Sequence, residues 1–539
     1  MEGKLNKLGI RKEEFSKWER RVVLTPRNCK QLIAKSKGKL VIKIEPSASR
    51  IFSDLAYQQA GCVIDSDFSD CQTILGVKQI PVKKLLPNKT YIFFSHTIKA
   101  QEQNMEMLDH ILKNNIKLID YEKISNENGE RLVAFGKFAG NSGAIDILAG
   151  LGSFLLNKGI GSPFLNIPQS YNYLNIDHAK SHIRTVSSQI ECYGLNPSIS
   201  PFIIGVTGTG RCSEGAIEIL KMLPHEFIQP NEMKDIITLA KKSPEKYNKN
   251  VYIVIFKHEH MVESINKSNG TFNKKDYYAN PNNYKGIFQE QYVQYLSVLI
   301  NCIYWESKYP KLLTESFLIK KLKKEPNFLR LLAISDVTCD FMGSIDFLKK
   351  FTTIDRPYFV YEPETGKASD NYQEASRGIL YNSIENMPSQ FPLDASNHFG
   401  NELTKFIPAI VNADSKKPID KQGLPNEILR AVITFDGKLT KNFAYISDLR
   451  KNKNQTQKIE KTEIKIQGNV INKEKVFKLL KSKFSVNEYT LKFDDLNKKI
   501  KKNTFSCLAT IKSEKAIKDI ILELANKYQK LGAIIKIVS

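Results

Sequence analysis

The chain has 539 residues and a mass of 61.4 kDa, enough for about three domains of ordinary size. Hydrophobic residues make up 41% and charged residues 25%, which is typical of a folded globular protein and excludes a wholly disordered chain. The formal net charge is +23, and from Arg450 onward 22 Lys and Arg stand against 9 Asp and Glu. More than half of the excess charge therefore lies in a basic C-terminal part, and the first 449 residues carry the remaining +10.

Several classes of protein are excluded at this stage. The longest apolar stretch, residues 143–156, is interrupted by Asp146 and glycines, so we expect no membrane-spanning helix. The N-terminus carries Glu2, Glu13 and Glu14 and lacks the apolar core of a signal peptide. Eight cysteines without a CxxC pair are too few for a disulfide scaffold. We therefore expect a cytoplasmic protein with reduced thiols and no membrane partner.

The first 135 residues alternate between short apolar runs and helical patterns. The runs are typical of strands, and alternation with helices predicts a parallel sheet covered by helices. We expect strands at 39–45, 71–77, 90–95 and 116–121 and a helix at about 101–113.

The middle of the chain repeats this pattern after a long helix rich in small residues, expected at 140–156. A buried strand at 201–206 runs directly into a glycine turn, and a helical stretch follows at 214–222. Further strands are expected at 251–256, 298–304 and 329–337, with a polar surface excursion at 267–284 and helices again from about 386.

The C-terminal part follows a polar, charged linker at about 446–460. Its apolar runs and helical patterns come in the order β-α-β-β-α-β, which is that of a ferredoxin-like module. We expect strands at 462–468, 487–493, 504–511 and 533–538 and helices at 473–484 and 513–530.

The glycine turn, IGVTGTGRCSEG at 204–215, is the first candidate for a cofactor site. Gly208, Thr209, Gly210 and Arg211 lie between a buried strand and a helix, where backbone N–H groups can approach a pyrophosphate. The GxGxxxxG spacing departs from the usual GxGxxG, so an ordinary structural turn stays open. The strand–turn–helix context favours a dinucleotide.

The next expected strand, 226–228, ends in Gln229 and Pro230, and the nearest acid is Glu232. A strand-end acid binds the ribose 2′-hydroxyl in NAD-dependent enzymes, and its absence removes the repulsion of a 2′-phosphate. The sequence therefore favours NADP(H), with NAD(H) kept as the alternative. Three lysines that follow could supply positive charge: Lys234, Lys241 and Lys242.

In the N-terminal part, Lys78 and His96 each come directly after an apolar run, where α/β folds place reactive groups. Either residue alone is more often a solvated loop residue. Their joint occurrence beside other polar segments is what suggests a site.

Six segments of the chain carry a family resemblance: WERRVVLTP, ILGVKQIP, FFSHTIKAQEQNMEMLDHIL, LIDYEKI, LVAFGKFAG and LINCIYWE. They resemble the lysine-ketoglutarate reductase family, the saccharopine-forming half of the bifunctional aminoadipic semialdehyde synthases, within the alanine dehydrogenase and transhydrogenase superfamily. NMPSQFP at 386–392 also resembles that superfamily's NMPGAVP segment. The resemblance covers about residues 8–450.

This resemblance implies an α/β fold of two Rossmann-like lobes flanking a cleft, with a small C-terminal ferredoxin-like, ACT-like domain. The substrate lobe would comprise 1–138 and about 390–445, and the dinucleotide-binding lobe 139–389. A linker at 446–460 and the C-terminal module at 461–539 would follow. The family's saccharopine-hydrolysing half is not recognised here, so a monofunctional reductase is implied.

The implied reaction condenses L-lysine with 2-oxoglutarate and reduces the imine with NADPH to saccharopine. The resemblance places the acid–base pair on Lys78 and His96, and a His/Lys pair suits proton transfer near neutral pH. Gln79 stands where lysine-forming relatives have a glutamate, which leaves the tuning of Lys78 open. Substrate contacts are implied for Arg21, Lys99, Glu122, Arg131 and Phe135, and cofactor contact for Asp336.

Several alternatives stay open. One is the NAD-dependent, lysine-forming saccharopine dehydrogenase; a remote one is a nucleic-acid-binding protein, although no RNP1-like motif occurs in the C-terminal strands. The C-terminal module would serve packing or homo-oligomerisation, or sense an amino acid. His258 and His260 lack an evident third ligand, so no metal is expected. Cysteines at positions like Cys212 and Cys302 occur in fungal relatives, which raises the hypothesis of a disulfide.

Overall fold

The structure is a computed structural model, which describes residues 5–266, 272–371 and 378–451, together with four strands of the C-terminal part. The chain divides into two compact units, one of Met1–Phe94 with Ile111–Gly437 and one of Ser95–His110 with Lys438–Ser539. Both large sheets belong to the first unit. This division does not test the predicted domain boundaries, which stay predictions.

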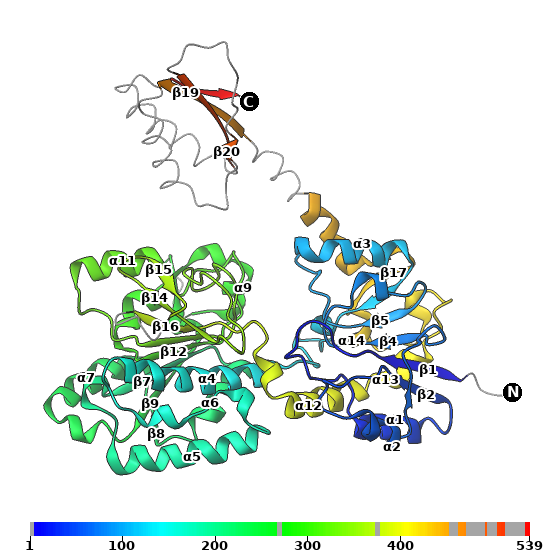
Figure 1. The fold of residues 1–539 in the computed structure, drawn as a ribbon, viewed down its shortest axis with the longest axis horizontal. Helices are drawn as coiled ribbons and strands as arrows, with labels where there is room; N and C mark the ends of the chain where they lie inside the picture. Colours follow the sequence, from blue (N-terminus) through cyan, green and yellow to red (C-terminus); the bar gives the residue numbers. More distant parts are fainter. Residues whose placement is uncertain are drawn as a thin grey trace. The chain divides into compact units, whose positions relative to one another are not determined.

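Within the first unit, the N-terminal sheet has the strand order β17-β6-β5-β4-β1-β2-β3, in which β17 is antiparallel to β6 and the other strands are parallel (Figure 1). β2, β4, β5 and β6 coincide with predicted runs, whereas β1, β3 and β17 were not predicted. β17 comes from a distant part of the chain and completes the sheet. The bounds are β1 Asn6–Ile10, β2 Leu40–Ile44, β3 Val63–Ile64, β4 Thr73–Leu75, β5 Thr90–Ile92, β6 Lys117–Ile119 and β17 Val432–Phe435.

Helix α1 (Pro26–Lys35) begins at the last residue of the WERRVVLTP segment because Thr25 caps it. The Thr25 hydroxyl accepts from the Asn28 N–H, and the Asn28 side chain accepts from the Thr25 N–H, which forms a reciprocal capping box. The other helices that accompany the N-terminal sheet in the first unit are α2 Asp54–Gln59, α12 Pro392–Thr404, α13 Ile407–Asn412 and α14 Asn426–Leu429. Helix α3, Met105–Lys113, spans the boundary between the two units.

Helix α4 (Gly136–Asn157) is the long helix that the sequence predicted, and it begins four residues earlier than expected. Among the described residues it is long and apolar enough to cross a membrane, but 83% of its most apolar window is buried inside the structure. Asp146 in this helix accepts from the Ser170 N–H at 2.8 Å and from Gln390 Nε2 at 2.5 Å. These bonds join the helix to the NMPSQFP segment.

The second sheet has the strand order β15-β14-β16-β13-β12-β7-β9-β8. Its strands β8, β9, β7, β12, β13 and β16 are parallel, and β14 and β15 are antiparallel additions at one edge. The two parallel-rich sheets confirm a mixed α/β fold consistent with Rossmann-like domains. The bounds are β7 Phe202–Thr207, β8 His225–Phe227, β9 Val251–Phe256, β12 Val298–Asn301, β13 Ala333–Asp336, β14 Tyr358–Glu362, β15 Lys367–Ser369 and β16 Ile379–Asn382.

The predicted surface excursion at 267–284 differs from the structure in its second half. Tyr277 and Tyr284 are 7% exposed and pack in the hydrophobic core with Phe288. Aromatic rings give this polar stretch enough apolar area to be buried. The small hairpin β10 (Val262–Ser264) and β11 (Tyr284–Gly286) lies here, with helices α8 His258–Met261, α9 Lys274–Ala279 and α10 Phe288–Gln291. The remaining helices are α5 Ile176–Tyr193, α6 Arg211–Leu220, α7 Met233–Lys242 and α11 Glu315–Lys324.

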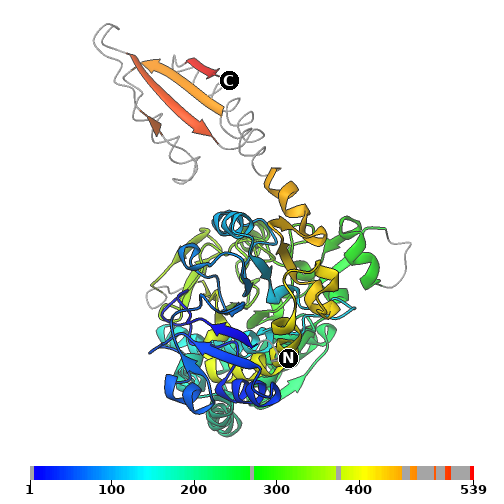
Figure 2. The same ribbon diagram turned by 90° about the vertical axis from the view of Figure 1, so that its right-hand side faces the viewer.

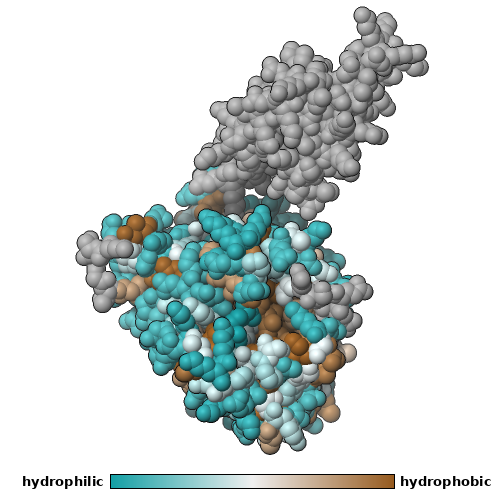
Figure 3. Space-filling model, turned by 90° about the vertical axis from the view of Figure 1, so that its left-hand side faces the viewer, coloured by the Kyte–Doolittle hydropathy of each residue, from teal (hydrophilic) through white to brown (hydrophobic). Residues whose placement is uncertain are grey.

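Apolar side chains fill the strands of both sheets, as the continuous runs in the sequence predict for parallel strands. All six residues of β7 are buried. In contrast, hydrophilic residues dominate the face shown in Figure 3, where a smaller group of apolar residues lies between them.

The described C-terminal strands form a separate antiparallel sheet in the order β20-β21-β19-β22. Figure 2 shows β19 and β21 as long antiparallel neighbours. The two predicted helices lie outside the described residues, so the ferredoxin-like module stays a prediction. The bounds are β19 Thr462–Asn469, β20 Leu491–Lys492, β21 Thr504–Ile511 and β22 Ile534–Val538, and the short β18 spans Lys438–Leu439.

Candidate active site

A buried ion pair follows β1 in the WERRVVLTP segment. Arg21 donates from Nε and Nη2 to the two carboxylate oxygens of Glu19 at 2.8 and 2.6 Å, and both residues are 2% exposed. Asn386 bridges the pair, since its Nδ2 donates to Glu19 at 2.7 Å and its Oδ1 accepts from Arg21 at 2.9 Å. Burial raises and the Arg21 cation lowers the pKa of Glu19, and the net direction is downward.

Phe135 covers the guanidinium of Arg21, with 4.1 Å between the Arg21 Cζ and the ring centroid. Phe135 itself stacks on Phe399 of α12 at 4.3 Å and 11°. The structure thus brings together two of the predicted substrate-binding residues. It also shows that Arg21 is held by Glu19 and Asn386, so a substrate carboxylate would meet a guanidinium whose orientation is already fixed.

Lys78 lies three residues after β4, at the carboxyl edge of the N-terminal sheet where the sequence placed it. Its ammonium lies 4.8 Å from the ring centroid of Phe15. Burial and the neighbouring Arg21 cation lower the pKa of Lys78 below its ordinary value. A lowered pKa makes the neutral amine of a lysine easier to form, which favours a role in general acid–base chemistry.

Glu13 holds the backbone on which Lys78 sits. Its Oε1 accepts from the Val77 N–H at 2.6 Å and its Oε2 from the Lys78 N–H at 2.9 Å. Burial and the negative charge of Glu19 raise the pKa of Glu13 to about 8, although the two amide bonds oppose this. The backbone at the predicted catalytic lysine is therefore held by a carboxyl group that can lose its proton near neutral pH.

Arg131 and Glu122 form an ion pair in which Arg131 is half exposed. Burial raises the pKa of the Cys212 thiol to about 11 and also raises the pKa of the Tyr304 hydroxyl. The charge of Arg131 partly opposes both shifts. Cys212 belongs to α6 and Tyr304 follows β12, so this predicted pair reaches groups at the carboxyl edge of the second sheet.

His96 and Lys99 belong to the second compact unit and are described within it. His96 has a positive φ of 51°, and its carbonyl accepts from Asn104 Nδ2 at 3.1 Å. The Lys99 N–H donates to Gln101 Oε1 at 3.2 Å, and its side chain is exposed. The proposed pairing of His96 with Lys78 stays a prediction.

The glycine turn has the geometry of an anion-binding helix start. Gly208 has a φ of +86°, and a Cβ there would lie 3.3 Å from the Cys302 carbonyl oxygen. Thr209, Gly210 and Arg211 are exposed, and a Cβ on Gly210 would meet no atom within 4 Å. No side chain caps α6, which leaves its first N–H groups for a ligand. These residues fit the pyrophosphate of a dinucleotide.

The last glycine of the GxGxxxxG pattern has a different task. A Cβ on Gly215 would lie 2.0 Å from the Lys137 carbonyl oxygen, and one on Gly140 would lie 1.8 Å from the Cys212 carbonyl oxygen. Gly215 and Gly140 therefore let α6 and α4 approach each other closely. The unusual spacing follows from this contact between helices rather than from a contact with phosphate.

Asp336, predicted near the cofactor, ends β13 and is 1% exposed. Its carboxylate accepts from the Tyr381 hydroxyl at 2.8 Å, from Asn301 Nδ2 at 2.9 Å and from the Cys339 N–H at 3.3 Å. Burial raises the pKa of Asp336 to about 6. Asn301 also accepts from the Thr207 hydroxyl at 2.9 Å, so this network joins the ends of three neighbouring strands.

Gln229 and Pro230 follow β8, and neither has a carboxylate that could bind a ribose hydroxyl. Glu232 accepts from the Gln229 N–H at 2.5 Å, so its carboxylate is used to cap the following turn. The neighbouring lysines are exposed: Lys234, Lys241 and Lys242.

The cysteine and histidine signals of the sequence form neither a disulfide nor a metal site in the part of the chain that the structure describes. Cys212 and Cys302 are free thiols, so the structure does not contain the hypothesised disulfide. His258 bonds to the Tyr278 hydroxyl at 3.1 Å, and His260 accepts from the Lys257 N–H. Across the described ranges, no three His, Cys, Asp or Glu side chains gather as metal ligands.

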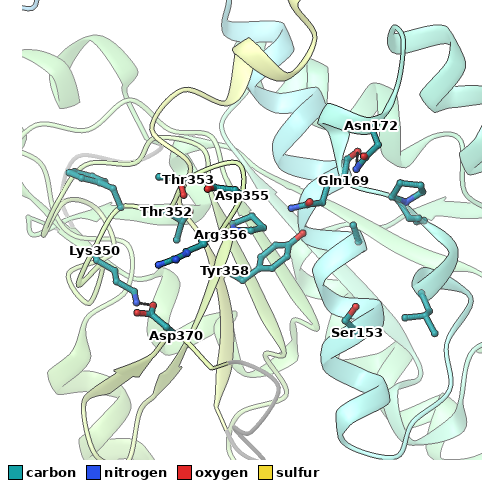
Figure 4. A pocket seen from close by; sticks show the side chains of 16 residues that line it. Ser153, Gln169, Asn172, Lys350, Thr352, Thr353, Asp355, Arg356, Tyr358 and Asp370 are labelled. Carbon is teal, nitrogen blue, oxygen red and sulfur yellow. Dashed lines mark hydrogen bonds and ion pairs between the residues drawn. The ribbon is translucent and has the colours of Figure 1, made fainter. Parts of the chain in front are cut away.

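A cavity of about 650 Å³ lies elsewhere, between the start of β14 and the second half of α4. Figure 4 shows Lys350, Arg356 and Asp370 on one side and Ser153 and Gln169 on the other. Lys350 and Asp370 form an ion pair. None of the predicted site residues is among those that line this cavity.

Sequence reasoning missed Glu13, Glu19 and Asn386 as parts of the site. The signal for Glu19 and Asn386 was present, because both lie in the segments WERRVVLTP and NMPSQFP that carried the resemblance. Glu13 gave no such signal, since its partners Val77 and Lys78 are more than sixty positions away.

Known proteins identify the class of this fold. The family model described as "Alanine dehydrogenase/PNT, N-terminal domain" matches residues 9–142. A solved L-alanine dehydrogenase has a similar fold, with a TM-score of 0.51 and 14% identity over 83% of this chain and 99% of that one. The chain therefore has the fold of this dehydrogenase class.

More similar relatives carry a more specific name. The chain is 38% identical over 496 residues to the alpha-aminoadipic semialdehyde synthase of Arabidopsis thaliana, covering 89% of this chain and 45% of the relative. It is 37% identical to the mitochondrial enzyme of that name from Bos taurus, over 84% and 49%. A Neurospora crassa saccharopine dehydrogenase [NAD(+), L-lysine-forming] is 25% identical, over 73% and 88%. The resemblance drawn from the motifs is confirmed, and the chain spans about half the length of the synthases it matches.

Proposed function

We propose that the chain is a lysine-ketoglutarate reductase, which condenses L-lysine with 2-oxoglutarate and reduces the product to saccharopine with NADPH. The observation that carries this proposal is its 38% identity to a synthase over 496 residues, in the part that contains the site described above. In these synthases the reductase is the N-terminal part. The lysine-forming dehydrogenases are more distant, which favours the degradative reaction.

The charges of the site support these substrates. Lysine and 2-oxoglutarate bring three carboxylates, which require cations. Arg131, which is half exposed, offers a planar guanidinium group for bidentate contact, and the buried Arg21 adds a second positive charge. Glu19 and Glu122 each pair with one of them. The carboxylates fix the two guanidinium groups and leave the total charge moderate, so the site can release its product.

The chemistry requires a proton acceptor and a proton donor. The substrate amine attacks the keto carbon as the neutral base, a carbinolamine forms, and water leaves to give the imine. Lys78, with its lowered pKa, would take the proton from the attacking amine and return one to the departing hydroxyl. We assign His96 as the second acid–base group of this sequence.

The nicotinamide, when bound, supplies the hydride that reduces the imine carbon. Gly208, Thr209, Gly210 and Arg211 would hold the pyrophosphate at the start of α6. We assign NADPH as the preferred donor because Gln229 and Pro230 follow β8 where an acid would select NADH. Asp336, whose bonds join the ends of three neighbouring strands, would support the edge of the sheet at which the nicotinamide would be held.

The decisive experiment measures oxidation of NADPH and of NADH with lysine and 2-oxoglutarate together and with each alone. We expect turnover with both substrates and NADPH, and identification of saccharopine by mass spectrometry. Turnover with NADH alone would favour the lysine-forming relative, and no saccharopine with either donor would contradict the proposal.

For the C-terminal part we propose a ferredoxin-like module that serves packing or homo-oligomerisation. The order β20-β21-β19-β22 is the order that this fold requires. Deleting residues 455–539 should lower the number of subunits per particle measured by light scattering and leave the dependence of turnover on lysine concentration unchanged. An altered dependence on lysine would instead assign a sensing role. Cytosolic residence is likewise a proposal, which fractionation of the cells can decide.

A further inference from the structure

Two cavities of the first unit differ in their balance of charge. In the cavity of Figure 4, Lys350 pairs with Asp370, and Asp355 pairs with Lys17. A second cavity of about 610 Å³ is lined by four lysines and one carboxylate, Asp436. Its lysines are Lys89, Lys117, Lys416 and Lys417, and its other polar groups are those of Asn88, Thr90, Asn115 and Ser415.

The second cavity lies at the amino edge of the N-terminal sheet. Thr90 is the first residue of β5, Lys117 is the first of β6, and Phe435 is the last of the antiparallel β17. Lys78 follows the carboxyl end of β4, which is the opposite edge. The cavity is therefore separate from the candidate active site.

Lys117 is the unusual member of this group because it is 6% exposed. Its Nζ donates to Gln422 Oε1 at 2.5 Å and lies 5.6 Å from the centroid of the Phe435 ring. Gln422 is fixed in turn, since its Nε2 donates to the Lys417 carbonyl at 2.8 Å. Burial lowers the pKa of Lys117 to about 8, and no carboxylate of the described chain offsets that effect.

Lys43, on β2 of the same sheet, shows how a buried lysine is ordinarily held. It is 9% exposed, and its Nζ lies 2.8 Å from Asp65 and 2.9 Å from Asp70. Those carboxylates raise the pKa of Lys43. An ammonium group that is buried with a single neutral acceptor is costly, because buried charges are ordinarily paired. An anion in the cavity would supply the missing pair for Lys117.

We propose that this cavity is a binding site for a small, multiply charged oxyanion, held by Lys117 and the surrounding lysines. The ligand carries phosphate or carboxylate groups, since lysine binds either as a point charge. Asn88, Asn115 and Ser415 line the same space and can donate to further oxygens. The site does not depend on the proposed enzymatic activity.

The test is thermal unfolding of the full chain at pH 7 in sodium pyrophosphate, sodium citrate or sodium chloride of equal ionic strength. A ligand of the native state raises the melting temperature, by about 2 °C at roughly ten times Kd for a chain of this size. We expect a saturating rise with pyrophosphate or citrate beyond that in chloride. The stronger of the two identifies a phosphate or a polycarboxylate ligand.

Lys117→Met should lose this rise and, in chloride, melt at or above the temperature of the native chain, because it removes an unpaired buried charge. Lys43→Met is the matched control, which should melt lower in every buffer and keep the rise. Anion binding at the glycine turn is common to all three proteins and cancels in the comparison. A full rise in Lys117→Met would overturn the proposal, and so would a loss of stability in chloride as large as that of Lys43→Met.

A second variant tests the site without changing the buried strand β6, to which Lys117 belongs. Lys416 and Lys417 are exposed on a loop, so the double substitution Lys416→Gln with Lys417→Gln leaves the core intact. We expect calorimetric titration with the stronger anion to give at least tenfold weaker binding in this variant. Unchanged affinity would overturn the site.

Discussion

The carboxyl ends of the two sheets differ in the groups that they present, which are charged side chains at the first and backbone at the second. Beyond the N-terminal sheet, ionisable side chains contact one another: Glu19 with Arg21, and Glu13 with the peptide of Lys78. Beyond the second sheet, the chain offers backbone at Gly208 and Gly210, supported by a network of bonds around Asp336. A charged edge suits proton transfer and a backbone edge suits a bound dinucleotide, so the difference predicts a division of labour.

The largest expected effect is on the charged edge. Lys78→Met should lower turnover by roughly 10²-fold or more because it removes the proposed general acid–base group, while NADPH binding stays intact. Turnover and fluorescence titration with NADPH measure the two separately. We expect the same pattern for His96→Gln.

Lys83→Met is the control for Lys78→Met, since Lys83 is an exposed lysine on the turn that follows. It should leave turnover unchanged. Wild-type turnover in Lys78→Met would remove this lysine from the mechanism. A loss of NADPH binding would assign it to the cofactor site and contradict the proposed role in proton transfer.

On the backbone edge, the strongest effect should come from Gly215→Ala. The new Cβ would lie 2.0 Å from the Lys137 carbonyl oxygen, so α6 must move away from α4, at a cost of about 2 kcal/mol in the free energy of unfolding. Urea denaturation measures this loss. Because α6 carries the glycine turn, NADPH affinity should fall as well.

Gly210→Ala separates binding from folding. Its Cβ would meet no atom within 4 Å, so we expect unfolding within about 0.5 kcal/mol of the native chain, but weaker NADPH binding. Equal NADPH affinity in Gly210→Ala and the native chain would contradict the assignment of this turn to the pyrophosphate.

How far the sequence could predict these edges depends on the range of the interaction. Lys78 and Gly208 could be predicted as site residues because each follows an apolar run that is typical of a strand. Glu13 could not be found in this way, since its function arises from the register between the segment after β1 and the turn after β4. Gly215 was read as part of a phosphate pattern, and only the distance between two helices reveals its task.

A smaller effect is expected for Glu13→Gln, and it should depend on pH. The pKa of Glu13 is raised to about 8, so below that pH the carboxyl is protonated and glutamine resembles it. Above that pH both oxygens accept from the Val77 and Lys78 N–H groups, whereas glutamine has one acceptor. We expect similar turnover below pH 7 and about tenfold lower turnover in the variant above pH 9, the equivalent of one lost bond to a charged group.

The control for Glu13→Gln is Glu14→Gln, the next residue along the chain. Glu14 pairs with Lys84 at the surface, and surface pairs contribute little. Its pH–rate profile should follow that of the native chain. A constant ratio between Glu13→Gln and the native chain from pH 6 to pH 9 would show that Glu13 does not act through its charge.

The smallest expected effect lies on the backbone edge, in the pH dependence of stability conferred by Asp336. Burial raises its pKa from 3.8 to about 6 in the folded chain, so between these values the native state binds more protons than the unfolded state. Stability must therefore fall as pH rises, by about 1 kcal/mol from pH 5 to pH 7 for this group. Asp336→Asn loses that slope, although it keeps only one acceptor oxygen for the Tyr381, Asn301 and Cys339 donors, which lowers its stability at every pH. Urea denaturation at the two pH values measures the difference, and equal slopes in both proteins would mean that Asp336 does not titrate between them.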